Sequence, residues 1–259
     1  MSEKTSIAWC RSTFNPFIGC TKVGPGCDHC YAEALDKRHR WKGDTHWGAG
    51  KPRMRTSPSN WAKPLAWNRA RLKDGKTHRV FCASLADVFD NEVPEEWRHD
   101  LFRLIRLTPA LTWLLLTKRI GNVAKIWPGG LYENVWLGVT VVNQEEADRD
   151  VPKLLSVNGV AKRFVSYEPA IGPVNWLKFR GLDWIIVGGE SQQGGAPREF
   201  RLSWAQDAID MARSIGAAPF VKQLGSGRGL KDRAGADPAE WPEDLRVQEF
   251  PRIEYARQP

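Results

Sequence analysis

Residues 135–155 read VWLGVTVVNQEEADRDVPKLL, an apolar run that is followed, after a short link, by a helical pattern. Val135–Thr140 predicts a strand and Gln144–Leu155 predicts a helix. The same order recurs along the chain, so we predict further strands at Ser6–Trp9, Arg79–Ala83, Thr112–Thr117, Lys162–Ser166 and Trp184–Val187. Further helices are predicted at Tyr31–Arg40, Glu95–Leu107, Arg119–Ile126 and Ser203–Ile215, the last with Ser203 capping its first turn.

The predicted strands are continuously apolar rather than alternating, which favours a parallel sheet covered by helices. Six such strands, five of them followed by a predicted helix, indicate either a βα barrel, complete or partial, or an open doubly wound sheet. The two architectures share one rule, because in both of them functional side chains gather at the carboxyl ends of the strands.

The composition is that of a folded chain, with 42% hydrophobic and 26% charged residues among 259, and it excludes an intrinsically disordered protein. Lys and Arg exceed Asp and Glu by 38 − 30 = 8, which is compatible with a polyanionic partner. No apolar run reaches the length of a membrane span, and the N-terminus lacks the apolar stretch of a signal peptide. We therefore expect a cytoplasmic protein, in which five cysteines do not form a disulfide framework.

Two segments depart from the strand–helix pattern. Residues 41–78 are basic and rich in Trp, Gly and Pro, and we predict that they form an insertion. Residues 225–259 begin with a glycine-rich loop and continue as an extended tail that Trp241, Leu245 and Phe250 pack onto the surface. The expected division is thus a barrel over residues 1–224 and a C-terminal extension over residues 225–259.

Three of the five cysteines lie in residues 20–31, CTKVGPGCDHCY, between the first predicted strand and the first predicted helix. Cys20, Cys27 and Cys30 have the spacing C-x6-C-x2-C and supply three thiolates. One interpretation is a zinc site, with His29 or Cys10 as a fourth ligand. The other is a 4Fe-4S cluster in which one iron has no protein ligand. The position after a strand favours the cluster, and both remain open at this point.

Beyond the cysteine spacing, several short motifs carry a resemblance to one family. They are NPFIGC (15–20), GCDHCYA (26–32), SLADVF (84–89), LLLTKR (114–119), LGVTV (137–141), SYEP (166–169), GGES (188–191) and WPEDLR (241–246). With these motifs the chain is similar to the radical S-adenosylmethionine superfamily, and more closely to a phage-associated and bacterial three-cysteine group distantly similar to spore photoproduct lyase, a DNA-repair enzyme. The first cysteine gap here is three residues longer than the commonest spacing of the superfamily.

This resemblance implies a partial (β/α)6 TIM-like barrel with a 4Fe-4S cluster on Cys20, Cys27 and Cys30. It implies that S-adenosylmethionine binds the open iron and is cleaved to a 5′-deoxyadenosyl radical. An electron donor such as a flavodoxin or a ferredoxin would then be a partner.

Polar residues follow each predicted strand, and they are the candidate contacts to cofactor and substrate. We expect Lys118, Arg119 and Tyr167 at the substrate, and the minority hypothesis for Cys82 is hydrogen-atom donation to a substrate radical. Several of these candidates also have a purely structural alternative. Ser84 and Asp87 could form turns, and Glu168 and Glu190 could form ion pairs. Cys82 could be a small buried hydrophobic residue. The candidate cofactor contacts are Ser84, Asp87, Thr140, Glu168 and Glu190.

The predicted insertion interleaves cations with Trp41, Trp47, Trp61 and Trp67, a combination that suits unpaired or flipped bases. The leading hypothesis is therefore a radical enzyme that acts on nucleic acid, for repair or base modification. A second hypothesis is the same chemistry on a small molecule or peptide. A third is a non-catalytic, zinc-pinned nucleic-acid-binding protein.

Overall fold

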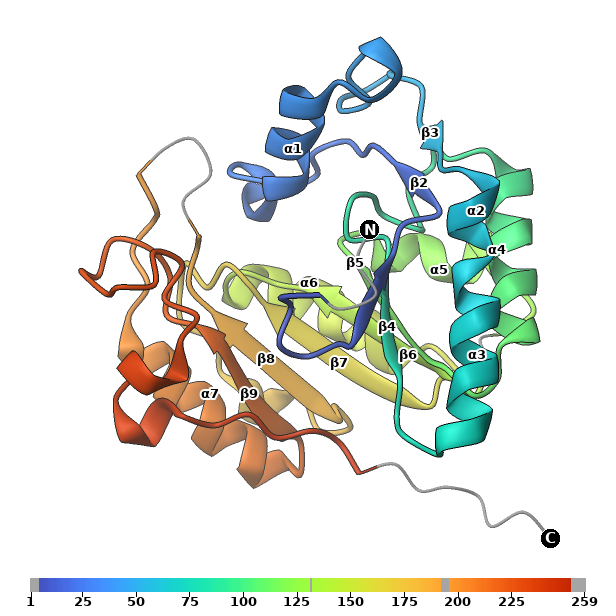
Figure 1. The fold of residues 1–259 in the computed structure, drawn as a ribbon. Coiled ribbons are helices and arrows are strands. Elements are labelled where there is room, and N and C mark those ends of the chain that lie inside the picture. Colours follow the sequence, from blue (N-terminus) through green and yellow to red (C-terminus); the bar gives the residue numbers. More distant parts are fainter. Residues whose placement is uncertain (1–4, 131, 192–195, 253–259) are drawn as a thin grey trace, which may run out of the picture.

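The computed structural model describes residues 5–130, 132–191 and 196–252. Its main feature is a curved, seven-stranded, wholly parallel sheet, which forms a half-barrel (Figure 1). The strand order is β1-β4-β5-β6-β7-β8-β9, with each strand beside the next one along the sheet. The strands are β1 (Ser12–Phe14), β4 (Arg79–Cys82), β5 (Thr112–Thr117), β6 (Val135–Thr140), β7 (Lys162–Tyr167), β8 (Trp184–Gly188) and β9 (Ala218–Gln223).

Helices cover the convex face of this sheet. The covering helices are α3 (Lys63–Asp74), α4 (Glu95–Leu107), α5 (Val123–Ile126), α6 (Gln144–Leu155) and α7 (Leu202–Ile215). In α4 the buried residues Leu101 and Ile105 are four positions apart and so lie on one side of the helix. Helix α6 begins where the Asn143 side chain accepts a hydrogen bond from the Glu146 amide at 3.0 Å.

The concave face carries its own apolar cluster, made mostly of aromatic rings. The buried Trp184 lies at its centre and contacts Trp9, Trp136 and Phe220 edge-on, with ring centroids 5.7 to 6.1 Å apart. Because aromatic side chains fill this side as well, the half-barrel is packed on both faces of the sheet. Among the described residues, no helix is both long and apolar enough to cross a bilayer.

The first strand–helix unit differs from the prediction. Residues 6–9 form no strand, and the first strand is β1, three residues further on. The predicted helix is present as α1 (Tyr31–His39), but it stands apart from the helices that flank the sheet (Figure 1). The segment predicted as an insertion instead supplies α3, which links β1 to β4 and places Trp67 in the main core. Trp9 nevertheless lies in the concave cluster, which explains the apolar signal at its position.

Short elements complete the segment between β1 and α3. A two-stranded antiparallel ribbon joins β2 (Phe17–Ile18) to β3 (Met54–Arg55), and α2 (Pro58–Trp61) precedes α3. The side chain of Ser57 caps α2 by accepting a hydrogen bond from the Asn60 amide. The predicted cap at Ser203 is wrong, because α7 already begins at Leu202 after Arg201, which makes no side-chain capping bond.

Strand β9 and the C-terminal extension lie at the other edge of the sheet. In the C-terminal extension, Trp241 and Leu245 are buried and Phe250 contacts Trp184 and Phe220. Gln248 forms an isolated antiparallel bridge with Phe220 of β9. The last seven residues of the predicted extension lie outside the described residues.

Candidate functional site

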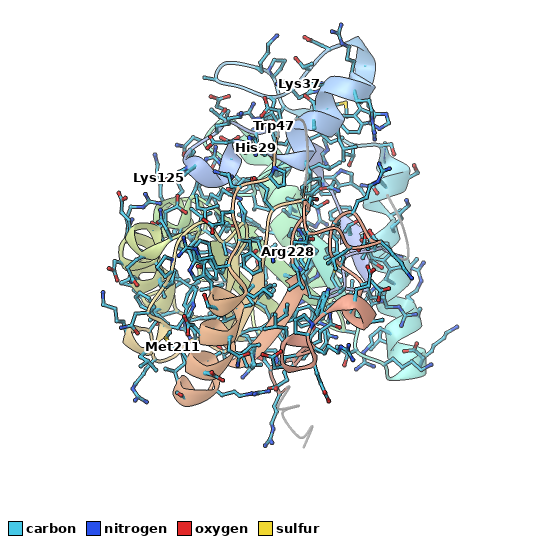
Figure 2. All side chains as sticks on the ribbon, turned by 90° about the vertical axis from the view of Figure 1, so that its left-hand side faces the viewer. His29, Lys37, Trp47, Lys125, Met211 and Arg228 are labelled. Atoms are coloured by element: carbon cyan, nitrogen blue, oxygen red, sulfur yellow. The ribbon has the colours of Figure 1, made fainter. Side chains whose placement is uncertain are left out.

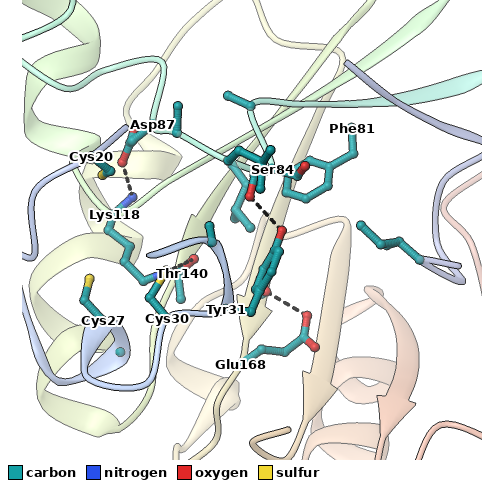
Figure 3. A pocket seen from close by; sticks show the side chains of 18 of the residues that line it. Cys20, Cys27, Cys30, Tyr31, Phe81, Ser84, Asp87, Lys118, Thr140 and Glu168 are labelled. Carbon is teal, nitrogen blue, oxygen red and sulfur yellow. Dashed lines mark hydrogen bonds between the residues drawn. The ribbon is translucent and has the colours of Figure 1, made fainter. Parts of the chain in front are cut away.

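A cavity of about 490 Å³ opens at the carboxyl ends of the strands, beneath the cysteine loop and α1. Figure 3 shows its lining from close by. The structure thus brings together side chains that follow five different strands, as the rule for parallel sheets predicts. The predicted site residues that line it are Cys20, Cys27, Cys30, Ser84, Asp87, Lys118, Arg119, Thr140, Glu168 and Glu190.

The three cysteines face this cavity from a single loop. Cys27 ends a one-turn 3-10 helix, Pro25–Cys27, and Cys30 immediately precedes α1. Figure 3 shows the three side chains on the same side of the cavity, with the Lys118 side chain running between them. All three are free thiols.

The number of these thiols bears on the kind of metal group that they could hold. A zinc ion holds its thiolates at about 2.3 Å, so its ligand atoms must converge on one point. Within the described ranges, no group of three His, Cys, Asp or Glu side chains converges in this way. A cluster takes one thiolate on each of several irons and therefore suits sulfur atoms spread around a wider space. Three thiols on one loop therefore match the three protein ligands of a cluster with one open iron, and they also match three of the four ligands of a zinc ion.

Cys20 is held from the sheet side by Arg119. The Arg119 guanidinium donates to Cys20 Sγ at 3.4 Å and to the Thr21 carbonyl oxygen at 2.5 Å. Burial, followed by the nearby Asp87 carboxylate, raises the pKa of the Cys20 thiol to about 12, and Arg119 opposes this rise. Asp87 in turn accepts from Arg119 at 3.1 Å and from the hydroxyl of Thr117 at 2.8 Å.

The other end of the loop is held by a separate network. His29 Nδ1 lies 2.9 Å from Glu190 Oε2, and Arg198 donates to Glu190 Oε1 at 2.6 Å. Arg198 also donates to the Pro25 carbonyl oxygen and to Asp28, so it joins this loop to the segment after β8. Burial acts to raise the pKa of Glu190, but the hydrogen bonds from Arg198 and His29 outweigh it and leave that pKa below its ordinary value.

Polar groups line the opposite wall of the cavity. Glu168 accepts a hydrogen bond from the Ser166 hydroxyl at 2.9 Å, and Lys222 Nζ lies 2.8 Å from its other oxygen. Tyr31 donates to the Ser84 carbonyl oxygen at 2.7 Å, which ties α1 to the loop after β4. These contacts leave the Ser84 hydroxyl bonded only to Asn15 within the described residues.

Lys118 differs from the other cations of the cavity. Its ammonium group lies 3.4 Å from the Thr140 hydroxyl and, across the described residues, has no carboxylate partner. A buried or half-buried cation of this kind is suited to an anionic ligand group.

Two predicted site residues lie elsewhere. Cys82 is completely buried in the core under the helices, where burial raises its pKa, and it does not line the cavity. Tyr167 is also completely buried, and its hydroxyl donates to the Gly172 carbonyl oxygen. Neither position suits the expected role: the structure puts both side chains on the convex side of the sheet, whereas the cavity is on the other.

The tryptophans and cations of residues 41–78 have separate locations. Trp67 stacks on His78 in the core, Trp61 packs against Phe14, and Trp41 stacks on His39. Only Trp47 of the four tryptophans named above lines the cavity. Figure 2 shows it at the end of the molecule that carries α1. The side chain of Arg53 is fully buried and unavailable to a phosphate.

Sequence reasoning missed several residues of the site. Asn15 is buried, donates to Ser84 and accepts from the Leu85 amide, so it fixes the loop after β4. Lys222 went unnoticed because β9 was not predicted. Asn15 had a signal, since it begins the NPFIGC motif. Gly19 of the same motif has φ +113°, and an added Cβ would lie 2.4 Å from the His46 carbonyl oxygen.

Comparisons with known proteins bear on this arrangement. A family model described as "Protein of unknown function (DUF5131)" matches residues 4–243. No curated protein matches the chain.

Two solved structures show a similar fold. A cysteine-to-serine mutant of spore photoproduct lyase is 12% identical with a TM-score of 0.50, over 83% of this chain and 78% of that one. A cysteine-to-alanine mutant of spore photoproduct lyase with dinucleoside spore photoproduct is 13% identical with a TM-score of 0.50, over 79% of this chain and 75% of that one. At such identities the likeness establishes the shared half-barrel fold and nothing finer.

Proposed function

We propose that this chain, which belongs to the family described as "Protein of unknown function (DUF5131)", is a radical S-adenosylmethionine enzyme that acts on nucleic acid. One observation carries the proposal. Cys20, Cys27 and Cys30 come from one loop and line one cavity at the carboxyl ends of a half-barrel. A fold shared with spore photoproduct lyase supports the same assignment.

The residues of the cavity divide into those that would hold a cluster and those that would meet its cofactor. Cys20, Cys27 and Cys30 would supply the three thiolates. A 4Fe-4S cluster with S-adenosylmethionine supplies reductive cleavage of a sulfonium bond to give a 5′-deoxyadenosyl radical. Lys118 would neutralise an anionic group at the thiolates, such as a carboxylate, and Thr140 would bond to the same group.

Other side chains would define the rest of the reaction space. Ser84 presents a hydroxyl on the opposite wall, and the Glu168–Lys222 pair presents a fixed dipole beside it. Trp47 and the aromatic residues Trp9 and Phe81 supply apolar walls that exclude water. We no longer assign a role in hydrogen transfer to Cys82, because it does not reach this space.

The nucleic-acid substrate rests on two supporting observations. One of the similar structures is described as spore photoproduct lyase with dinucleoside spore photoproduct, which is a dinucleoside ligand by its printed name. The chain also carries a net charge of +8 and places Trp47 at the cavity, where an indole could stack on a base. A flavodoxin or ferredoxin donor, the link to phage and a cytoplasmic location stay predictions.

The test of the chemistry uses anaerobically reconstituted protein. With S-adenosylmethionine and a reductant, the wild type should release 5′-deoxyadenosine, and Cys27→Ala should abolish that release together with the visible absorption of the cluster. Cys82→Ala is the matched control, because it removes a thiol that lies outside the cavity, and it should retain both. Release that survives Cys27→Ala would refute the assignment.

The test of the substrate class is the binding of a single-stranded oligonucleotide as a function of salt. Contacts to phosphates predict that the logarithm of the association constant falls steeply and linearly with the logarithm of salt concentration. Binding that is absent at low salt, while 5′-deoxyadenosine release persists, would redirect the proposal to a small molecule or peptide.

A further inference from the structure

Arg119 makes contacts that a substrate-binding arginine would not make. Its guanidinium donates to Cys20 Sγ and to the Thr21 carbonyl oxygen, and its side chain is only 10% exposed. Both contacts point to the first cysteine of the loop rather than to the open part of the cavity. The donors of Arg119 that make these contacts are therefore engaged by the protein itself.

Asp87 fixes the direction of this guanidinium. One carboxylate oxygen accepts from Arg119 and from the Lys118 amide, and the other accepts from the Phe89 amide and the Thr117 hydroxyl. With both oxygens engaged, Asp87 has little left to offer a cofactor, contrary to the expectation from its position after β4. Its geometry instead holds Arg119 against the Cys20 sulfur.

A second buried arginine, Arg53, also binds Thr21, the residue next to Cys20. Arg53 donates to the Thr21 hydroxyl at 2.7 Å and to Asp90 at 2.7 Å, and its side chain is fully buried. Asp90 also lies 3.9 Å from Arg119. Arg119 thus donates to the carbonyl oxygen of Thr21 and Arg53 donates to its hydroxyl group, so the two arginines fix the backbone next to Cys20.

We propose that Arg119 is a positioning residue for the thiolate of Cys20 and that its hydrogen bond to the sulfur raises the reduction potential of the bound cluster. The inference rests on the proposed function, because it requires a cluster on this loop. An added electron increases the negative charge on the cluster sulfurs, so a fixed positive donor stabilises the reduced form more than the oxidised form. In this way the protein would ease the reduction that precedes cofactor cleavage.

The experiment measures the midpoint potential of the reconstituted cluster by redox titration with electron paramagnetic resonance. Arg119→Gln should shift the midpoint to more negative potential, leaving about tenfold less reduced cluster at a fixed potential, which corresponds to about 59 mV for one electron. Arg106→Gln is the matched control, because it removes an exposed arginine at the end of α4. It should leave the midpoint unchanged.

The outcomes separate this role from a merely structural one. A structural role would lower the iron content of Arg119→Gln without moving the midpoint of the clusters that form, and that result would overturn the proposal. If Arg119→Gln does not fold, Arg119→Lys carries the test, and a smaller negative shift is expected because the charge remains but the paired donors are lost. An unchanged midpoint in Arg119→Lys would then overturn it. A wild type that takes up no cluster would instead refute the proposed function itself.

Discussion

The fully buried Arg53 leads to a sharp prediction about stability. Its guanidinium donates twice to Asp90, once to the Thr21 hydroxyl, and to the backbone carbonyl groups of His46, Gly48 and Lys51. Arg53→Ala removes all of these bonds and leaves the Asp90 carboxylate buried without its main partner. Removing one member of a buried ion pair costs about 3–5 kcal/mol.

The effect should be large enough to measure by heat as well as by denaturant. For a protein of this size, 1 kcal/mol shifts the melting temperature by roughly 2–4 °C, so Arg53→Ala should lower it by about 6–20 °C. The assay is urea and thermal unfolding of cluster-free protein, followed by circular dichroism. Arg69→Ala, an exposed arginine on α3, is the control and should change stability by less than about 0.5 kcal/mol.

A double-variant cycle tests the cause of the loss. Arg53→Ala combined with Asp90→Ala should cost less than the sum of the two single substitutions, because the second change removes a charge that has already lost its partner. Additive costs, or a cost for Arg53→Ala no greater than for the control, would refute the buried pair. Either result would also make Arg53 a candidate contact to nucleic acid again.

Two further substitutions probe other parts of the structure. Burial, followed by the nearby charge of Arg11, lowers the pKa of His78 to about 4, below the value of about 6.5 in an unfolded chain. On acidification His78 is protonated first in the unfolded state, so the free energy of unfolding should be unaffected by His78 above pH 6.5 and should fall by up to about 3 kcal/mol toward pH 4. In urea unfolding, His78→Gln should reduce this dependence of the free energy on pH. An unchanged dependence would contradict the assignment to His78. Trp47→Ala should weaken oligonucleotide binding about tenfold through loss of stacking at the cavity, whereas Trp41→Ala, outside the cavity, should not; equal losses in fluorescence anisotropy would argue against stacking by Trp47.

The sequence predicted those elements whose signal is local. The bounds of β5, β6, α4 and α6 agree with the structure, because each combines a continuous apolar run or a helical repeat with a clear end. Strand β9 was missed because Pro219 and Lys222 interrupt the apolar run of APFVKQ. Pro219 is tolerated because β9 lies at the edge of the sheet, and Lys222 is paired with Glu168 at the cavity. The first strand was misplaced because Trp9 packs in the apolar cluster on the concave face and is not part of a strand.

The site was predictable at the level of strand ends but not of side-chain direction. Successive residues of a strand point to opposite faces, so Phe81 and Cys82 could not be assigned to the cavity and the core without the register of the sheet. Pairings between distant residues carried no local signal either. Arg53 and Asp90, for example, are 37 positions apart in the chain and read separately as one surface cation and one loop anion.

The long first gap of the C-x6-C-x2-C motif acquires a physical meaning from these pairings. A loop of six residues between Cys20 and Cys27 would leave the first thiol free to move relative to the other two, because Gly24 and Gly26 give the backbone between them wide freedom. The structure anchors the two halves separately, with Arg119 at Cys20 and with Glu190 and Arg198 at the half that contains His29. Since the anchors come from the segments after β5 and after β8, the relative position of the thiols follows the curvature of the sheet rather than the length of the loop. Loss of either anchor should therefore disturb the geometry of the proposed cluster even when all three cysteines remain.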